Sequence, residues 1–339
     1  MTITKPIRRV AIIGTGVIGA SWAAQYLAKG LDVVATDVAP DAEASLRKFV
    51  KSAWPTLERL GLAPGASQSR LTFTRDLPTA LAGVDLVQEN GPERIDFKKK
   101  LYRELDELLP ADVIIASSSS GLTMSGIQSD CPSHPERCVI GHPFNPPHLI
   151  PLVEIVGGTK TSEETIRRAA AFYTSIGKQT VRLNKELPGH VANRLQAALA
   201  REVYYLVDEG VVSVADVDTA LCWGPGLRWG IMGQVMLNHL GGGPGGIEHM
   251  LKQFTGPITA WWKVLGSPTL TAELQKKLID GAHAEAGTRS VEELEAERDE
   301  ILLGLLELRT KRSGTKAEPS DGPVSVLRES PDLFGASPI

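Results

Sequence analysis

The chain has 339 residues, enough for about two domains of ordinary size and for a substantial buried core. Apolar residues make up 42% and charged residues 22%, which is typical of globular proteins and unlike a collagenous or wholly disordered chain. Lys and Arg total 36 against 40 Asp and Glu, so the net charge of −4 provides no basic field for nucleic acid. The three cysteines form no CxxC pair, which argues against a disulfide framework or a metal site and favours a reducing cytoplasm.

The N-terminal segment is basic and then apolar, as a secretion signal is, but three glycines interrupt its apolar stretch. No apolar run reaches the roughly 18 residues that a membrane span requires. We therefore expect a cytoplasmic protein with no membrane partner.

In the first half of the chain, short segments rich in Val and Ile alternate with stretches of helical periodicity. This alternation predicts an α/β fold with a Rossmann-type, doubly wound and mostly parallel sheet. The expected strands are Arg9–Ile13, Asp32–Thr36, Leu71–Phe73, Asp85–Gln88, Val113–Ala116, Cys138–Gly141, Leu152–Val156 and Gln179–Arg182.

The pattern changes after Pro188, and we expect an all-helical C-terminal domain. Helical spacing of apolar residues covers 189–209, Ser213 caps the next helix, and a last helix covers 291–312. The glycine-rich stretch 223–246 predicts a shaped loop or a broken helix. The predicted domains are 1–187 and 188–312, followed by a poorly ordered or loosely docked tail, 313–339.

A glycine-rich motif joins the first expected strand to a helix. Gly14, Gly16 and Gly19 form G-x-G-x-x-G, in which the first glycine turns the chain, the second admits a pyrophosphate and the third lets helix and strand pack closely. Val17 and Ile18 open the helix, whose N-terminal N–H groups would face the phosphates. The alternative is a glycine-rich turn without a ligand.

The second expected strand ends at Asp37, 18 positions after the last glycine of the motif. A carboxylate there accepts hydrogen bonds from ribose hydroxyls and repels a 2′-phosphate. The residues that follow offer no arginine for such a phosphate, so we predict NAD rather than NADP. A turn or cap role for Asp37 is the alternative.

Polar residues near strand ends and in the helical half form a second set. Ser120, His142, Glu154 and Asn193 provide a hydroxyl, a base of near-neutral pKa, a carboxylate to orient it, and an amide. Together they can accept a hydroxyl proton and hold an oxygen while a hydride leaves. Individually, each could be an ordinary structural or surface residue.

The chain resembles the L-3-hydroxyacyl-CoA dehydrogenase superfamily over residues 7–310. The 12-residue separation of His142 and Glu154 and the P-G-x-x-x-N-R-L sequence at 188–195 carry the resemblance. It implies that His142 is the general base, that Glu154 is its partner, and that Ser120 and Asn193 hydrogen-bond the substrate oxygen. It also implies a homodimer formed through the helical half.

By the same resemblance, Glu93 and Lys98 form a pair on the cofactor side, and Asn145 lies near the nicotinamide. The alternative for the pair is a solvent-exposed ion pair. The serine run at 117–122 and the prolines after His142 depart from the acyl-CoA members and resemble a free-acid branch. That branch includes dehydrogenases of L-carnitine and L-gulonate and the lens lambda-crystallins.

The segment 224–233 is most similar to the carnitine-oxidising members, although Gln234 stands where a proline is expected. A quaternary ammonium binds aromatic faces and carboxylates, so Trp223 and Trp229 are candidates for a cation cage. Arg228 could pair with a substrate carboxylate or form a structural salt bridge. We expect NAD-dependent oxidation of a small L-3-hydroxy acid, with L-carnitine first and L-gulonate, a short acyl-CoA thioester or a non-catalytic structural role as alternatives.

Overall fold

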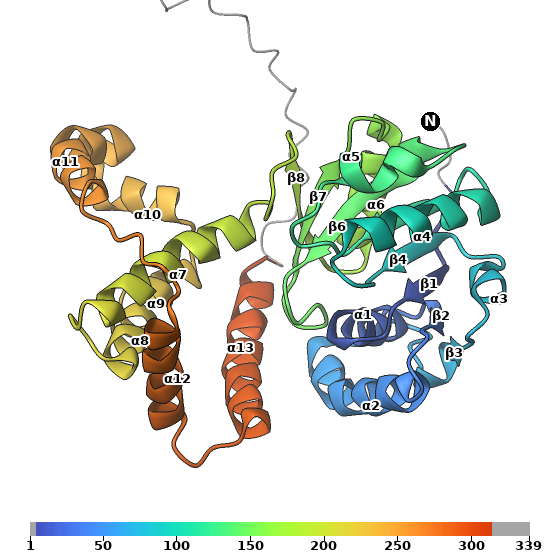
Figure 1. Cartoon of the computed structure of the whole chain (residues 1–339), viewed down its shortest axis with the longest axis horizontal. Coiled ribbons are helices and arrows are strands. Elements are labelled where there is room, and N and C mark those ends of the chain that lie inside the picture. Colours follow the sequence, from blue (N-terminus) through green and yellow to red (C-terminus); the bar gives the residue numbers. More distant parts are fainter. Residues whose placement is uncertain (1–4, 314–339) are drawn as a thin grey trace, which may run out of the picture.

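The computed structural model describes residues 5–313, so the predicted tail falls outside the described residues except for its first position. An eight-stranded sheet in the order β3-β2-β1-β4-β5-β6-β7-β8 forms the first half of the molecule (Figure 1). Only the β6–β7 pair is antiparallel within this sheet. The strands are β1 Arg9–Ile13, β2 Asp32–Thr36, β3 Leu71–Phe73, β4 Leu86–Glu89, β5 Ile114–Ser117, β6 Cys138–Pro143, β7 Leu152–Gly157 and β8 Gln179–Leu183.

Helices cover both faces of the sheet and bury two separate hydrophobic clusters. One cluster packs α1 (Val17–Ala28), α2 (Ala42–Leu60) and α6 (Glu163–Ser175) against one face. The other packs α3 (Leu77–Leu81), α4 (Ile95–Leu108) and α5 (Met124–Ile127) against the opposite face. The central strands β1, β4, β5 and β6 are buried from both sides, as expected for a doubly wound sheet, whereas the edge strands β3 and β8 are partly exposed.

The second half contains no strand among its described residues. Its helices are α7 Ala192–Asp208, α8 Val214–Trp223, α9 Pro225–Trp229, α10 Gln234–Gly241, α11 Gly246–Trp262, α12 Ala272–Ala286 and α13 Val291–Ser313. The Ser213 side chain accepts a hydrogen bond from the Asp216 N–H, which confirms the predicted cap. The glycine-rich stretch is a series of short helices, consistent with the prediction of a broken helix.

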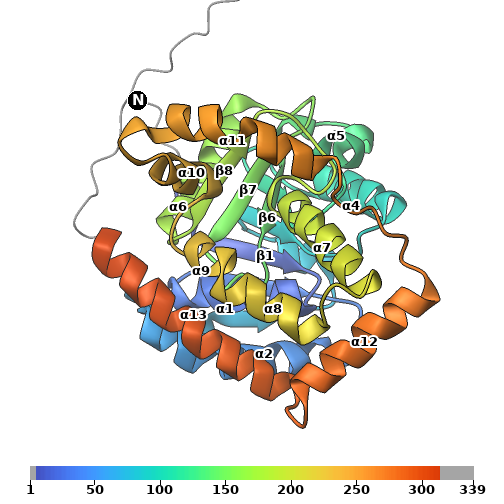
Figure 2. The ribbon, with the colours of Figure 1, turned by 90° about the vertical axis from the view of Figure 1, so that its left-hand side faces the viewer.

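The last helix returns to the sheet half and lies alongside α2 (Figure 2). Arg59 of α2 donates to Glu300 at 2.5 Å and to Glu307 at 3.4 Å, both on α13. Leu303 of α13 is buried. The two halves of the molecule are therefore joined both by the chain segment before α7 and by the contact of α13 with α2.

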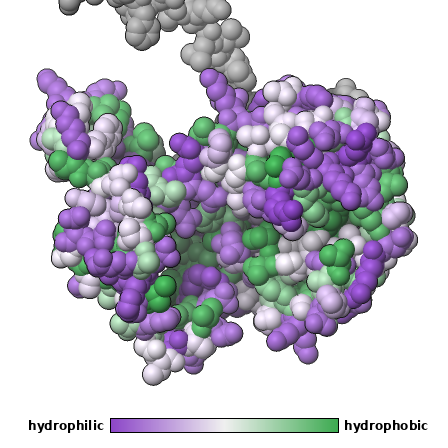
Figure 3. Space-filling view, viewed as in Figure 1, coloured by the Kyte–Doolittle hydropathy of each residue, from purple (hydrophilic) through white to green (hydrophobic). Residues whose placement is uncertain are grey.

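The helical half exposes many large apolar side chains. Hydrophobic residues lie on its surface and around the hollow between the two halves (Figure 3). The exposed set includes Leu195, Trp223, Leu227, Val235, Trp261 and Trp262. Within residues 5–313, no helix has both the length and the apolar character required to cross a membrane.

The predicted fold class is confirmed. Three of the eight predicted strands have the observed bounds, and the other five are displaced by one or two residues at their ends. The division at residue 187 stays a prediction.

Candidate active site

The glycine-rich motif forms a tight turn between β1 and α1. Gly14 has a φ of +83°, and a Cβ added there would lie 2.8 Å from the Asn90 carbonyl oxygen. At Gly19 an added Cβ would lie 1.9 Å from the Gly14 carbonyl oxygen, so a side chain at either position would displace backbone. At Gly16 an added Cβ would meet nothing within 4 Å. The backbone of Gly16 thus faces open space, and the cradle fits the pyrophosphate of a dinucleotide.

Asp37 lies beside this turn, at the end of β2. Its Oδ2 accepts from the Thr15 N–H at 2.6 Å and the Thr15 hydroxyl at 2.9 Å, and its Oδ1 accepts from the Ala39 N–H at 3.0 Å. Partial burial raises the Asp37 pKa, but these hydrogen bonds outweigh it, so the pKa lies below its usual value. The carboxylate therefore stays charged and keeps acceptor capacity for ribose hydroxyls.

The structure also brings an arginine to this end of the site, which the local sequence did not indicate. Arg75 donates from Nη2 to the Pro40 carbonyl at 2.6 Å, and the Ala39 carbonyl is 3.5 Å away. Its guanidinium thus holds the backbone of the loop after Asp37.

A histidine and a glutamate face each other across the antiparallel strands β6 and β7. His142 and Glu154 are register partners, and Nδ1 of His142 lies 2.8 Å from Oε2 of Glu154. A carboxylate only accepts, so Nδ1 donates and Nε2 is left free to accept a proton. Both side chains are at least 95% buried.

Glu154 also holds the first turn of α7. Its Oε1 accepts from the backbone N–H groups of Val191 at 2.8 Å and Ala192 at 3.0 Å. Burial raises the Glu154 pKa, but the hydrogen bonds from His142 and these N–H groups lower it by more, so the pKa is below its usual value. One carboxylate therefore orients the imidazole and fixes the start of the helical half.

A second histidine, His190, packs against the first, with ring centroids 5.0 Å apart. Its Nε2 donates to the Ser119 carbonyl at 2.9 Å, and its Nδ1 is buried without a hydrogen-bond partner. Burial lowers the His190 pKa, so the ring stays neutral beside His142. Sequence reasoning missed this residue, although it lies inside the 188–195 motif.

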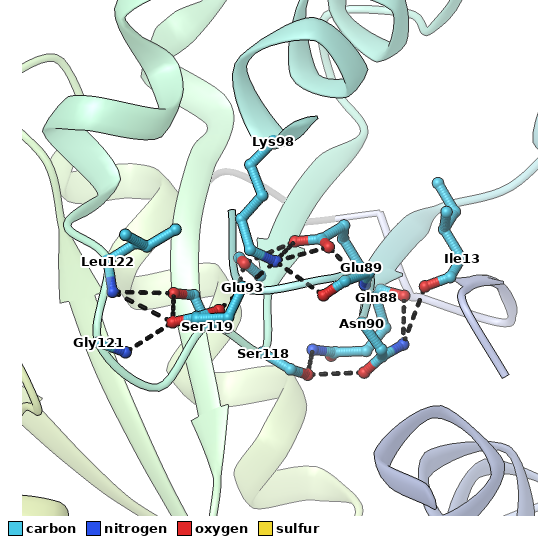
Figure 4. Close-up of polar contacts among 12 residues, drawn as sticks. Ile13, Gln88, Glu89, Asn90, Glu93, Lys98, Ser118, Ser119, Gly121 and Leu122 are labelled. Carbon is cyan, nitrogen blue, oxygen red and sulfur yellow. Dashed lines mark hydrogen bonds and ion pairs between the residues drawn. The ribbon is translucent and has the colours of Figure 1, made fainter. Parts of the chain in front are cut away.

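Figure 4 shows the polar network around the serine loop, the segment 117–122 that follows and includes the end of β5. Ser119 donates to Glu93 at 2.6 Å, and the Gly121 N–H donates to the same oxygen at 2.8 Å. Lys98 is 1% exposed and donates to both oxygens of Glu89, at 2.7 and 2.8 Å, whereas Glu93 lies 3.9 Å from its Nζ. Lys98 is thus not part of a solvent-exposed pair, and its close partner is Glu89, which sequence reasoning missed.

These elements enclose a cavity of about 260 Å³. The cavity lies between the end of β5, the end of β6 and the first turns of α1 and α7. Asn193 lies near Ser120, its Nδ2 being 3.5 Å from the Ser120 carbonyl oxygen. The lining residues include Ile18, Ser118, Ser120, His142, Asn145, Asn193 and Gln196.

The tryptophans and arginine suggested for substrate binding do not line this cavity. Trp223 ends α8 and is 79% exposed, and Trp229 donates from its indole N–H to Gln234 at 2.6 Å. Arg228 is exposed on the short α9. The substrate role of these three residues stays a prediction.

The chain matches two family descriptions that together cover most of its length. Residues 9–187 match "3-hydroxyacyl-CoA dehydrogenase, NAD binding domain", and residues 189–284 match "3-hydroxyacyl-CoA dehydrogenase, C-terminal domain". The chain belongs to the 3-hydroxyacyl-CoA dehydrogenase family. It is therefore an NAD-dependent oxidoreductase, as the site and the resemblance predicted.

Several relatives within this family carry a narrower name. The chain is 47% identical to the L-carnitine dehydrogenase of Streptomyces griseus over 92% of this chain and 94% of the relative. It is 46% identical to the L-carnitine dehydrogenase of Bacillus cereus over 90% and 93% of the two chains.

Solved structures of the family share the fold. A 5-formyl-3-hydroxy-2-methylpyridine 4-carboxylic acid 5-dehydrogenase, described as an NAD⁺-dependent dismutase, is 34% identical and has a TM-score of 0.76, covering 89% of this chain and 98% of that one. The (S)-3-hydroxybutyryl-CoA dehydrogenase of Ralstonia eutropha is 25% identical, with a TM-score of 0.60 over 82% and 95%.

Proposed function

We propose that this protein oxidises L-carnitine to 3-dehydrocarnitine with NAD as the hydride acceptor. The observation that carries the proposal is the His142–Glu154 pair. His142 lines a cavity that Ile18, next to the glycine-rich turn, also lines. The names of the relatives support L-carnitine as the substrate within this family.

His142 acts as the general base in this proposal. Glu154 holds Nδ1 in its protonated form, so Nε2 is the free acceptor for the C3 hydroxyl proton. As the proton moves, the imidazole becomes positive, and the adjacent carboxylate stabilises that charge. His190 stays neutral and packs against the ring of His142 without adding positive charge.

Ser120 and Asn193 position the substrate oxygen. Both line the cavity with His142, and neither brings a charge to it. A hydroxyl and an amide can hydrogen-bond the alcohol and then the carbonyl oxygen that replaces it. His190 and Glu93 hold the serine loop in place through Ser119.

The cofactor is held by Gly14, Gly16, Val17, Ile18 and Gly19 at the pyrophosphate and by Asp37 at the adenosine ribose. When bound, its nicotinamide supplies the acceptor for the hydride that leaves C3. Asn145 lines the cavity beside His142, where it would contact the nicotinamide. Glu93 and Lys98 order the serine loop and the end of β4 on the same side.

A direct assay tests the function. The purified protein is given NAD with L-carnitine, D-carnitine, L-gulonate or L-3-hydroxybutyryl-CoA, and NADH formation is followed by absorbance. We expect the highest kcat/KM with L-carnitine. A higher value with L-gulonate or the thioester would contradict the proposed substrate and leave the dehydrogenase class intact.

We also propose a cytoplasmic homodimer formed through the helical half. Trp261 and Trp262 of α11 are 61% and 69% exposed, and Trp223 is 79% exposed. Covering such large apolar side chains is favourable by about 25 cal/mol for each Å² removed from water. The three cysteines are free thiols, as expected in a reducing compartment.

A further inference from the structure

A second cavity, of about 150 Å³, adjoins the active-site cavity. Asn145 lines both cavities, and the neighbouring residues Val17 and Ile18 line one each. The remaining walls are one face of α2, the loop after β6 and one face of α13. The lining residues include Phe49, Ser52, His148, Glu295, Arg298 and Asp299.

The α13 wall lies beyond both family matches, which end at residue 284. It is held over α2 by the contacts of Arg59 with Glu300 and Glu307. Glu295, Arg298 and Asp299 occupy positions i, i+3 and i+4, so they lie on one face of the helix. The cavity is thus closed by a segment that the family descriptions do not include.

The charges around the second cavity favour a cation. Arg298 reaches Oδ1 of Asp299 from Nε at 2.8 Å and from Nη2 at 2.7 Å, which neutralises one carboxylate. Glu295 then leaves the wall with one net negative charge. The Phe49 ring adds an aromatic surface, and a cation near aromatic faces and carboxylates is stabilised by both.

His148 does not oppose a cation there. Its side chain is 8% exposed, and its Nδ1 is 2.8 Å from the Ser21 hydroxyl. Burial lowers the pKa of His148 to about 4, so the ring is neutral near pH 7. Its ring also packs edge-on against Phe49, with centroids 5.6 Å apart.

We propose that this second cavity binds the trimethylammonium group of the substrate, with the net negative charge of Glu295, Arg298 and Asp299 as the counter-charge and Phe49 as the aromatic wall. The inference rests on the proposed function. In L-carnitine a single methylene separates C3 from the ammonium nitrogen, so the reacting carbon and the cation must occupy adjoining spaces. This assignment places the cation between α2 and α13 rather than beside Trp223 and Trp229.

The test compares charged and uncharged substrates in the full-length protein. The double variant Glu295→Gln with Asp299→Asn removes both negative charges and keeps the side-chain shapes. Glu292→Gln is the control, because Glu292 is an exposed carboxylate of the same helix outside the cavity wall. The substrates are L-carnitine and its electroneutral analogue with a tert-butyl group in place of trimethylammonium.

We expect the double variant to raise the KM for L-carnitine about 3- to 30-fold with less than about twofold change in kcat. Its kcat/KM for the tert-butyl analogue should stay within about twofold, which also shows that the variant is folded. An unchanged KM for L-carnitine, or an equal loss with both substrates, would overturn the proposal. A rise in the KM for L-carnitine on Arg298→Gln alone would also overturn the proposal. Such a rise would indicate that the cavity binds the substrate's carboxylate rather than its trimethylammonium group.

A binding measurement separates this inference from the proposed reaction. γ-Butyrobetaine has the trimethylammonium and carboxylate groups but no hydroxyl, and its affinity is measured by calorimetry in the presence of NADH. We expect the double variant to weaken this affinity by about the same 3- to 30-fold as its KM for L-carnitine rises. Glu292→Gln should leave the affinity unchanged. If the wild type binds γ-butyrobetaine in this way but does not oxidise L-carnitine, the proposed function fails while the cation site stands.

Discussion

The double role of Glu154 makes Glu154→Gln an informative perturbation. One carboxylate oxygen accepts from Nδ1 of His142 at 2.8 Å, and the other accepts from two backbone N–H groups of α7 at 2.8 and 3.0 Å. A glutamine has one acceptor oxygen, and its amide nitrogen only donates. If the oxygen stays with the backbone, the amide NH₂ faces Nδ1 and moves the His142 proton to Nε2. The atom that should take the substrate proton then already carries one.

We expect kcat to fall about 10²- to 10⁴-fold, as for loss of a general base or its correct tautomer. The lost charge-assisted hydrogen bond to His142 should lower the free energy of unfolding by about 1.5–3 kcal/mol. NADH affinity should change little, because Glu154 lies outside the glycine-rich cradle. The measurements are NADH formation under saturating substrate, NADH titration by fluorescence, and urea unfolding.

Glu186→Gln is the matched control. Glu186 accepts from the backbone N–H of Ser125 at 2.8 Å and from its hydroxyl, and it does not contact His142. Its replacement should leave kcat within about twofold. A Glu154→Gln enzyme that keeps more than about a tenth of the wild-type kcat would refute the assignment of His142 as a base oriented by Glu154.

Three further predictions follow from the described contacts. Asp37→Ala should lower kcat/KM with NAD about 10- to 100-fold through lost charged hydrogen bonds to the ribose, and a wild type that already favours NADP in the same assay would contradict this. The pKa of His148 falls from 6.5 in the unfolded chain to about 4 in the folded protein, so stability should decrease as the pH falls from 6.5 to 4. Urea unfolding should show this decrease in the wild type and a weaker one in His148→Gln, and equal pH slopes would argue against a neutral His148. Light scattering at micromolar concentration should give about twice the 36.4 kDa chain mass, whereas a mass near that of one chain would rule out the homodimer.

The sequence by itself determined the strands and the cofactor turn. A doubly wound sheet requires short runs of Val and Ile separated by helices, and this signal is local, so β1, β2 and β3 were predicted with their observed bounds. Gly14 and Gly19 are likewise readable in sequence, because only glycine tolerates the backbone approach found at each position. The pairing of His142 with Glu154 followed from the spacing within a known family, and the antiparallel register of β6 and β7 accounts for it.

Only the tertiary structure decided which charges meet. The family resemblance paired Lys98 with Glu93, which lies 3.9 Å from its Nζ, but the fold places both carboxylate oxygens of Glu89 closer, at 2.7 and 2.8 Å. A fully buried ammonium needs such a close carboxylate. Arg59 and Glu300 are 241 positions apart, so no local pattern relates them. Their contact docks α13 over α2 and forms a charged cavity beside the active site. The tryptophans remain the cation cage that the sequence predicts, whereas the packing of two distant helices lines this second cavity with Glu295, Asp299 and Phe49, which no local pattern related to the active site.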